Sequence, residues 1–359
     1  MSKTNHQQYI SLALELAERG RLTVSPNPMV GCVIVKNNTI VGQGYHQRAG
    51  DAHAEINALR NAGSKAENAT MYVTLEPCCH VGKTPPCVNA IIQAQIKKVV
   101  VACLDPNPLM SGKSISILQN AGIEVDIGIC EQEAKTLNEI FFHYITTKRP
   151  FVIAKWAMSI DGQTITHPED NRQISCAESH KQTHHLREQV DAILIGANTA
   201  RVDNPLLTVR LGESPRHHPI RIILSSTGQL PENLNLFSHS LPAKTIIVAT
   251  EKICSQLINQ YQKNNIELLI IKSNQHGQVD IKNLLEELGK RHITSLLVEG
   301  GMTIHQHFFA EKLVNKIHVY IAPVFIGKTK TKIPVRFSTI KNSGADIVVT
   351  GIHGEKQYV

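Results

Sequence analysis

Three side chains with zinc-binding chemistry, His53, Cys78 and Cys87, lie in one short stretch of the chain. One imidazole and two thiolates supply three nitrogen and sulfur ligands, which leave the fourth corner of a tetrahedral zinc ion open to water. An open corner is typical of catalytic zinc. Glu55 follows His53 by two residues and is not needed as a ligand, so its carboxylate can carry a proton beside the ion. The pattern predicts one Zn²⁺ held by His53, Cys78 and Cys87, with Glu55 as the catalytic acid and base.

The spacing of the two cysteines departs from the usual arrangement. His-x-Glu followed by Pro-Cys is the signature of zinc deaminases, in which a second Cys follows the first after two residues. Here Val81 occupies that position, and the next thiol partner is Cys87. Cys79 and His80 compete as ligands by proximity, but adjacent residues of one loop rarely point at the same metal. A closed zinc site and a chain without metal are the alternatives.

The predicted elements place the motif where an α/β domain holds its ligands. Residues 52–62 predict a helix with His53 and Glu55 in its first turn. Residues 71–75 predict a short buried strand that runs directly into the loop of Cys78. Ligands of open α/β sheets bind at this carboxyl edge of the strands. The context therefore favours a catalytic metal site over the alternatives.

The rest of the first half alternates strands and helices. The pattern predicts a helix over 7–19, a β-hairpin of 30–35 and 39–44, strands over 97–102 and 123–127, and helices from 87, over 114–121 and over 131–147. This alternation indicates one three-layer α/β domain over residues 1–147. Between the first helix and the hairpin, Asn27 stands between two prolines. A side-chain amide held in this way can read a base edge, although Asn between prolines can also be a simple turn former.

After a joint at 147–150 the pattern restarts as a second α/β domain, residues 148–359. It predicts strands over 151–157, 192–196, 221–224, 245–249, 266–271 and 295–298, helices over 177–188, 251–263, 280–290 and 302–312, a loop over 199–210 and a β region from 316. Gly300 and Gly301 stand between a buried strand and a helix. Glycines at that point let backbone amides approach a pyrophosphate, which the helix dipole also favours.

Composition limits the partners. The 359 residues suffice for about two domains. No apolar run reaches the roughly 20 residues of a membrane span, and the polar start predicts no signal peptide, so we expect a cytoplasmic protein that contacts no membrane. Eight cysteines in such a chain favour free thiols and a metal site. The charge of +7 is scattered and only 4% of residues are aromatic, so we expect a small phosphorylated substrate and no nucleic acid. We also expect a homo-oligomer.

Four motifs carry a family resemblance: Ser25-Pro26-Asn27-Pro28, His53-Ala54-Glu55, Thr74-Leu75-Glu76-Pro77-Cys78 and Thr84-Pro85-Pro86-Cys87. Through them the sequence resembles the bifunctional riboflavin-biosynthesis deaminase–reductases, in which a long gap between the two cysteines is typical. The resemblance implies a cytidine-deaminase-like first domain that hydrolyses the ring amino group of 2,5-diamino-6-(5-phosphoribosylamino)pyrimidin-4(3H)-one. It suggests Asn27 and His46 as residues that hold the base. Lys83 is a candidate phosphate contact, with a simply solvated lysine as the alternative.

The resemblance extends over nearly the whole chain and implies a dihydrofolate-reductase-like second domain that uses NADPH. The motifs there are 155–162, 199–210 and 298–301. They imply hydride transfer to C1′ of the ring-opened ribosyl group of 5-amino-6-(5-phosphoribosylamino)uracil, which gives a ribityl product. The implied NADPH contacts are Ala157, Gln173, Thr199, Asp203, Ser226, Gly301, Met302, Thr303, Ile304, His305, Gln306 and His307. The implied substrate contacts are Asn171, Arg187, Leu207, Arg210 and Glu299.

One position departs from the family pattern. Where the family often has Ser-x-Trp, this chain has Asn171-Arg172-Gln173. Asn171 can still hydrogen-bond a phosphate, but Gln173 cannot stack on the cofactor as Trp would. Lys155 and Asp203 are the candidates that position and polarise the carbon to be reduced, with an ordinary salt bridge as the alternative.

Two other functions are compatible with parts of the sequence. A tRNA or nucleoside deaminase with an unrelated C-terminal domain would share the zinc motif, but the long cysteine gap and the sparse aromatic residues argue against it. A metal-stabilised binding protein without turnover would not need Glu55, which is intact.

Overall fold

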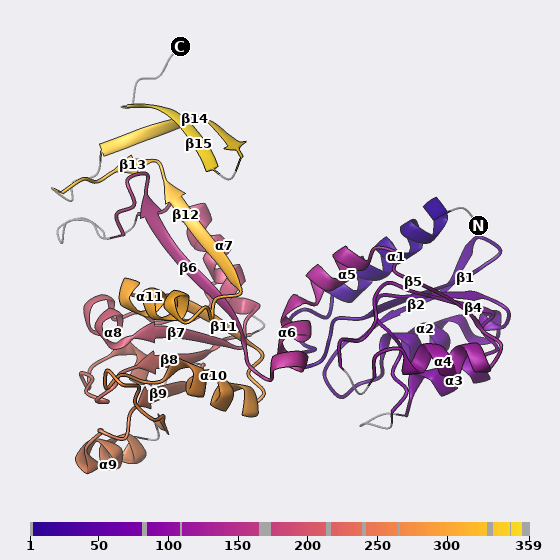
Figure 1. The fold of residues 1–359 in the computed structure, drawn as a ribbon, viewed down its shortest axis with the longest axis horizontal. Helices are drawn as coiled ribbons and strands as arrows, with labels where there is room; N and C mark the ends of the chain where they lie inside the picture. The colour runs from indigo at the N-terminus through magenta and orange to yellow at the C-terminus, as the bar shows by residue number, and fades with distance from the viewer. Residues whose placement is uncertain are drawn as a thin grey trace. The chain divides into compact units, whose positions relative to one another are not determined.

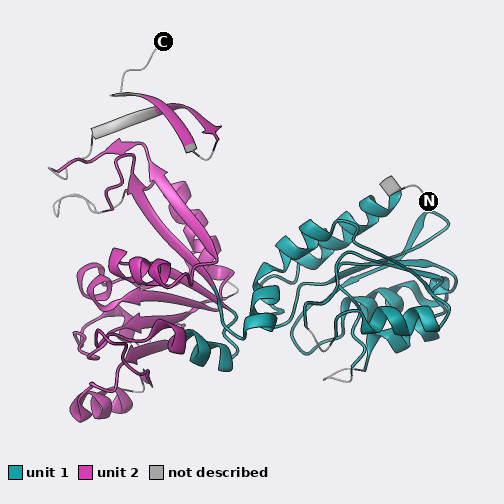
Figure 2. Cartoon of the chain, viewed as in Figure 1, with its two compact units in different colours: residues 1–151, 285–294 teal, residues 152–284, 295–359 magenta. Residues whose placement is uncertain are grey.

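A computed structural model describes residues 3–80, 85–107, 110–164, 174–212, 217–238, 242–264, 266–328, 333–344 and 346–353. The chain divides into two compact units (Figure 2). The first comprises residues 1–151 and 285–294, and the second comprises residues 152–284 and 295–359. Within the described residues, no helix combines the length and the apolarity that crossing a bilayer requires.

The first unit is built around a five-stranded sheet with strand order β2-β1-β3-β4-β5. β1 runs antiparallel to β2 and β3, whereas β3, β4 and β5 are parallel. Its elements are α1 (Lys3–Glu18), β1 (Gly31–Lys36), β2 (Thr39–Tyr45), α2 (Ala54–Ala62), the 3₁₀ turn η1 (Gly63–Ala66), β3 (Thr70–Val73), α3 (Cys87–Gln93), β4 (Lys98–Val101), α4 (Lys113–Asn120), β5 (Glu124–Ile127), α5 (Glu131–Leu137) and α6 (Glu139–Thr147).

Helices cover both faces of this sheet (Figure 1). On one face α2, α3 and α4 pack residues such as Ala58, Ile91 and Leu118 against the strands, and on the other face α1 and α5 do the same. Burying one such large aliphatic side chain stabilises the fold by roughly 1.5–3 kcal/mol. The predicted three-layer α/β architecture is confirmed.

Two local predictions in this unit have different outcomes. The hairpin turn is confirmed: Asn37 and Asn38 have φ of 51° and 60°, the left-handed values that a two-residue turn between twisted strands requires. The single helix predicted over 131–147 is wrong, because Asn138 separates α5 from α6. The side chain of Asn138 binds both backbone groups of Met29, each at 2.8 Å, and this pairing competes with helix continuation.

The second half of the chain forms a seven-stranded sheet with strand order β10-β9-β8-β7-β11-β6-β12. Its elements are β6 (Phe151–Ser159), α7 (Ala177–Glu188), β7 (Ala192–Gly196), α8 (Ala197–Asp203), β8 (Ile220–Leu224), the 3₁₀ turn η2 (Asn235–Phe237), β9 (Thr245–Ala249), α9 (Ser255–Lys263), β10 (Glu267–Ile270), α10 (Ile281–Lys290), β11 (Ser295–Gly300), α11 (Met302–Ala310) and β12 (Lys316–Ala322). A further small sheet contains β13 (Val324–Phe325), β14 (Ile333–Ser343) and β15 (Asp346–His353).

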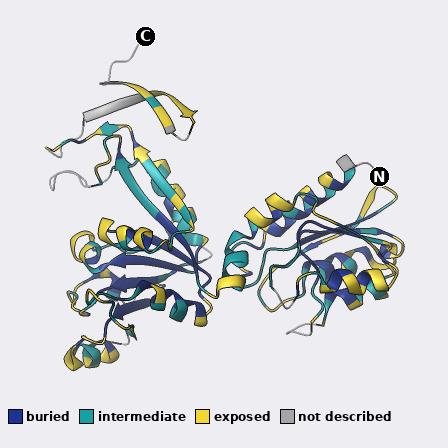
Figure 3. Cartoon of the chain, in the orientation of Figure 1, coloured by how far each residue is buried: buried dark blue, intermediate teal, exposed yellow. Residues whose placement is uncertain are grey.

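The central strands of the large sheet are buried along their whole length, as the dark strands in Figure 3 show. Such continuous apolar runs are typical of parallel strands covered on both faces. The neighbouring pairs from β10 to β11 are parallel, as are β6 and β12. The predicted second α/β region is confirmed, with one change: α8 occupies the start of what we expected to be a loop over 199–210.

Candidate active sites

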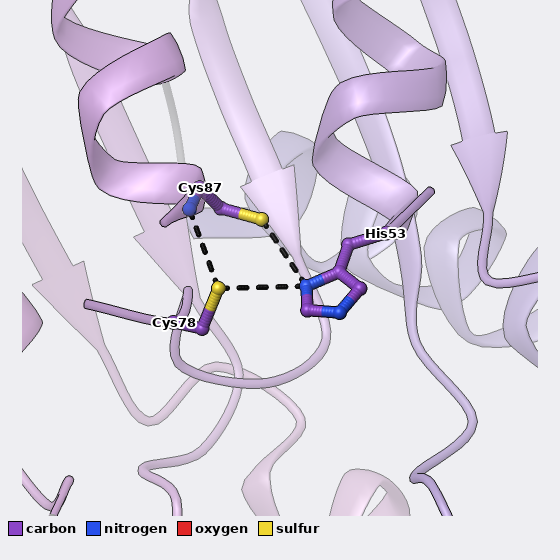
Figure 4. A group of neighbouring side chains, drawn as sticks. All are labelled: His53, Cys78 and Cys87. Atoms are coloured by element: carbon purple, nitrogen blue, oxygen red, sulfur yellow. Dashed lines mark hydrogen bonds between the residues drawn. The ribbon is translucent and has the colours of Figure 1, made fainter. Parts of the chain in front are cut away.

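His53, Cys78 and Cys87 converge on one point at the carboxyl edge of β3 (Figure 4). His53 is the N-cap of α2, and Cys87 is the first residue of α3. His53 Nδ1 lies 3.5 Å from Cys78 Sγ and 3.3 Å from Cys87 Sγ. A tetrahedral zinc ion, with bonds of about 2.0–2.3 Å, separates its nitrogen and sulfur ligands by about 3.5 Å. The three side chains therefore fit one Zn²⁺.

The protonation of the two thiols also suits a cation. A hydrogen bond from Cys87, aided by His53, lowers the pKa of Cys78 to about 4. Because Cys87 is the donor in that pair, its own pKa is raised. The backbone N–H of Cys87 donates to Cys78 Sγ at 3.3 Å and favours the same thiolate. A bound metal ion takes the place of the remaining thiol proton.

Glu55 stands beside this cluster and is almost fully buried, with 3% of its surface exposed. Burial, and then the negative charge on Cys78, raise the pKa of Glu55 to about 7. A carboxyl group with such a pKa can take up and release a proton near neutral pH, which general acid–base catalysis requires. Glu55, His53 and Cys78 line the same cavity of about 390 Å³.

Asn27 and His46 line this cavity as well, and their hydrogen bonds fix how Asn27 is oriented. His46 Nδ1 lies 3.2 Å from the carbonyl oxygen of Ala52, which can only accept, so the ring proton sits on Nδ1. Burial lowers the pKa of His46, which keeps the ring neutral. Its Nε2 then accepts from Asn27 Nδ2 at 3.1 Å. Asn27 is left with Oδ1 as its acceptor for a bound molecule.

The loop that carries Asn27 is held by a residue that the sequence did not identify. Asn138, which is 2% exposed, clamps the backbone of Met29 from the break between α5 and α6. The only local signal for it is a single asparagine inside a helical pattern. Phe141 and Ile145 of α6 add apolar surface to the cavity.

The second candidate site lies at the carboxyl edge of the large sheet. Ser226, Thr199 and Gly301 follow β8, β7 and β11, which are neighbours in the sheet. The N–H of Gly301 donates to Thr199 Oγ1 at 3.1 Å, and a Cβ on Gly301 would also stand 3.1 Å from that oxygen. The first amides of α11 have no intrahelical carbonyl, and the helix dipole favours an anion there. This edge fits the pyrophosphate of a dinucleotide such as NADPH.

Two predicted substrate contacts bind each other beside this edge. The Arg187 guanidinium forks onto the Glu299 carboxylate with two hydrogen bonds of 2.7 Å. Their side chains are only 12% and 8% exposed. Arg187 Nη1 donates to the carbonyl oxygen of Thr208 at 3.3 Å, and Thr208 Oγ1 accepts from Arg210 Nη1 at 3.3 Å. The guanidinium of Arg187 is therefore already hydrogen-bonded within the protein, and Arg210 is the guanidinium more available to a ligand.

The same cluster contains Lys155 on β6. Burial lowers the pKa of the Lys155 ammonium group. Its other members include His184 on α7, which sequence reasoning missed because nothing in its spacing marks it. His184 Nδ1 accepts from the backbone N–H of Arg210 at 3.3 Å. Burial and Arg187 lower the pKa of His184 to about 4, so it stays neutral. Three cations face one carboxylate here, which leaves net positive charge for a phosphate.

The remaining predicted contacts differ in their surroundings. His305 is 3% exposed and packs against the Trp156 ring with a centroid separation of 5.4 Å. Leu207 is buried with φ of 52°. The other members of the set are Ala157 on β6, Asp203 at the end of α8, and Met302, Thr303, Ile304, Gln306 and His307 on α11. Lys83, Asn171 and Gln173 lie outside the described residues.

Comparison with known proteins accounts for both units. A family model described as "RibD C-terminal domain" matches residues 150–348, and one described as "Cytidine and deoxycytidylate deaminase zinc-binding region" matches residues 3–103. The riboflavin biosynthesis protein RibD of Aquifex aeolicus is 42% identical and covers 96% of this chain and 97% of its own. RibD of Escherichia coli is 39% identical, with 89% and 88% covered.

Solved structures give the same result. RibD of Acinetobacter baumannii superposes with a TM-score of 0.81 at 35% identity, over 99% of this chain and all of its own. A diaminohydroxyphosphoribosylaminopyrimidine deaminase/5-amino-6-(5-phosphoribosylamino)uracil reductase of Thermotoga maritima gives 0.79 at 33% identity, with 97% and 98% covered. The match over residues 150–348 argues against an unrelated second domain.

The ligand geometry predicts which cysteine holds the metal. Cys87→Ser should release bound zinc, because it removes one of three ligands, whereas Cys79→Ser should retain it, because Cys79 is not part of the cluster. Elemental analysis of the two purified variants, alongside the unmodified protein, measures this. Equal zinc loss in both variants, or loss only in Cys79→Ser, would contradict the assignment.

Proposed function

This chain belongs to the RibD family of riboflavin-biosynthesis proteins, bifunctional enzymes with a zinc deaminase and an NADPH-dependent reductase, and we propose how its residues divide the two reactions. Deamination exchanges the ring amino group of 2,5-diamino-6-(5-phosphoribosylamino)pyrimidin-4(3H)-one for a carbonyl oxygen from water and releases ammonia. Reduction converts the ribosyl group of the product to ribityl and consumes NADPH and a proton. The observation that carries this assignment is the cluster of His53, Cys78 and Cys87 beside a cavity that His53, Cys78 and Glu55 line. We assign residues 1–147 to the deaminase and residues 148–359 to the reductase.

In the deaminase, His53, Cys78 and Cys87 would hold Zn²⁺, whose Lewis acidity makes water nucleophilic near neutral pH. Glu55 accepts the proton of the attacking water on its carboxylate and delivers it to the departing amino nitrogen. Its raised pKa permits both transfers. Burial of the carboxylate in the cavity wall keeps bulk water from exchanging that proton.

Recognition of the pyrimidine falls to Asn27 in this proposal. Its Oδ1 accepts a hydrogen bond from an N–H of the ring, because one N–H of its Nδ2 donates to His46 and fixes the orientation of the amide. His46 is therefore a positioning residue that fixes the amide, rather than a donor to the base. Lys83 remains the proposed phosphate contact from sequence.

Replacing Glu55 by Gln tests the deaminase assignment. The amide cannot carry a proton, so the rate of ammonia release should fall by about 10²–10⁴-fold, the usual contribution of general acid–base catalysis. Zinc content and NADPH-dependent reduction of the deaminated intermediate should not change. Glu67→Gln, at an exposed glutamate of the same unit, is the matched control. Full deaminase activity in Glu55→Gln would disprove the proposed role.

In the reductase, we assign NADPH to the edge formed by Ser226, Thr199 and the start of α11, with Ala157 and Asp203 completing the set. Gln173 remains a proposed cofactor contact from sequence. The bound cofactor supplies the hydride. The positive cluster of Lys155, Arg187 and Arg210 holds the phosphorylated substrate.

Within this cluster each residue has a distinct proposed role. Glu299 orients Arg187 through their two hydrogen bonds. Lys155, on the neighbouring strand β6, polarises the carbonyl oxygen of the open ribosyl chain. Arg210 binds the phosphate, aided by Asn171. Leu207 contributes apolar contact to the substrate.

Arg210→Gln tests the phosphate assignment. Losing one charge-assisted contact should raise the KM for 5-amino-6-(5-phosphoribosylamino)uracil by about tenfold or more, the equivalent of about 1.5–3 kcal/mol, and leave the KM for NADPH unchanged. Steady-state kinetics at saturating NADPH measures this. Lys181→Gln, at an exposed cation of α7, serves as the control. An unchanged substrate KM in Arg210→Gln would show that the phosphate binds elsewhere.

We also propose that the chain forms a homo-oligomer and works in the cytoplasm. β12 is an edge strand, and large apolar side chains on it and on the small sheet are exposed: Ile317, Ile321, Phe325, Ile340, Ile347 and Val348. A second copy would cover this surface. The zinc thiols need the reducing conditions that the cytoplasm maintains. Sedimentation velocity and cell fractionation check the two statements, and a monomer or a secreted protein would contradict them.

A further inference from the structure

One wall of the deaminase cavity has no regular secondary structure. It is the segment between β4 and α4, of which residues 102–107 and 110–112 are described. Asp105, Asn107 and Met110 from this segment line the cavity. Without a helix or a strand, other contacts have to set the distance between this wall and the metal ligands.

The carboxylate of Glu76 supplies those contacts. Its Oε2 accepts from the N–H of Asp105 at 3.2 Å and from the N–H of Gly112 at 3.0 Å, one in each described part of the segment. Its Oε1 accepts from the N–H of Ser114 at 3.2 Å and from the Ser114 hydroxyl at 2.6 Å, in the first turn of α4. One carboxylate thus joins both described parts of the segment to the helix that follows.

Two of these hydrogen bonds are buried and two are partly buried. Glu76 is 5% exposed and Ser114 is fully buried, so water competes little for the Ser114 donors. A negative charge at the first turn of a helix is also favoured by the helix dipole. Both oxygens are occupied by donors, so the carboxylate of Glu76 has no role in binding substrate, although the residue borders the cavity.

Glu76 also belongs to the segment that carries a metal ligand. Its backbone N–H donates to the carbonyl oxygen of Cys103 at 3.0 Å, which continues the pairing of β3 with β4, and Cys78 follows two residues later. The stretch 76–78 therefore has two functions. It positions the metal ligand Cys78, and through the side chain of Glu76 it positions the residues that line the cavity.

We propose that Glu76 is a positioning residue for deamination, which holds the cavity-lining residues 105–107 and 110–112 at a fixed distance from the metal ligands and so sets the affinity for the pyrimidine substrate. This inference rests on the proposed deaminase function. The proton transfers belong to Glu55, so Glu76 contributes to binding and leaves the chemical step to other groups.

Glu76→Gln is the test variant, because it preserves shape and removes one acceptor. Each oxygen of Glu76 accepts from two donors. In the Gln variant, the side-chain NH₂ therefore faces an N–H donor in either orientation of the amide and loses hydrogen bonds. The KM for the pyrimidine phosphate should rise by about tenfold or more, which corresponds to about 1.4 kcal/mol. The kcat for ammonia release should change far less, and zinc content and the reductase KM should stay the same.

Ser114→Ala is the graded control. It removes only the hydroxyl donor and leaves the three backbone donors in place, so its KM should lie between those of the unmodified enzyme and Glu76→Gln. It also keeps the proposal testable if Glu76→Gln fails to fold. Amide hydrogen exchange gives a second measurement: the N–H groups of Asp105, Gly112 and Ser114 should exchange faster in Glu76→Gln.

The outcomes separate this proposal from the proposed function. Loss of zinc, a fall in kcat with unchanged KM, or unchanged exchange of the three amides would overturn the role of Glu76. Absence of ammonia release from the unmodified enzyme would instead overturn the deaminase assignment, while the exchange measurement would still report whether Glu76 holds the loop.

Discussion

Two thiols and an imidazole held within hydrogen-bonding distance of one another are the constraint on which the first unit depends. Such a cluster is stable when a cation replaces the thiol proton, and the elements around it are arranged to keep it together. β3 delivers Cys78, the start of α2 delivers His53, and the start of α3 delivers Cys87. The buried alanines of α2 allow this helix to lie close to the sheet, so that Glu55 reaches the same cavity.

In the second unit, strand ends also bring the candidate site residues together, but these are backbone amides, hydroxyls and charged side chains instead of metal ligands. Three adjacent strands end at one edge, where backbone amides and small side chains are suited to a dinucleotide. Beside it, the buried pair Arg187 and Glu299 is tolerated because two hydrogen bonds join the opposite charges and Arg187 Nη1 also donates to the carbonyl oxygen of Thr208. Holding Arg187 in this way orders the cluster and leaves Arg210 as the more available guanidinium. Both units therefore place their candidate sites at the carboxyl ends of parallel strands, where strand ends bring distant residues together.

Much of this arrangement was predictable from local sequence. The two-asparagine turn, the start of α3 at Cys87 and the metal set follow from short motifs with a clear physical cause. The features that sequence missed depend on partners far along the chain. Asn138 breaks a helix because it binds Met29, and Glu76 anchors a loop through Gly112. No local sequence pattern predicts such pairings, because Asn and Glu also occur as solvated side chains.

In the proposed deaminase, three protein ligands hold the metal and leave one corner to water. X-ray absorption spectroscopy at the zinc edge of the purified protein measures this coordination. We expect one nitrogen and two sulfur neighbours at about 2.0–2.3 Å, together with one oxygen. A shell of three sulfurs, or four protein ligands without oxygen, would mean that Cys79 or His80 closes the site, and the assignment of catalysis to this cavity would fail.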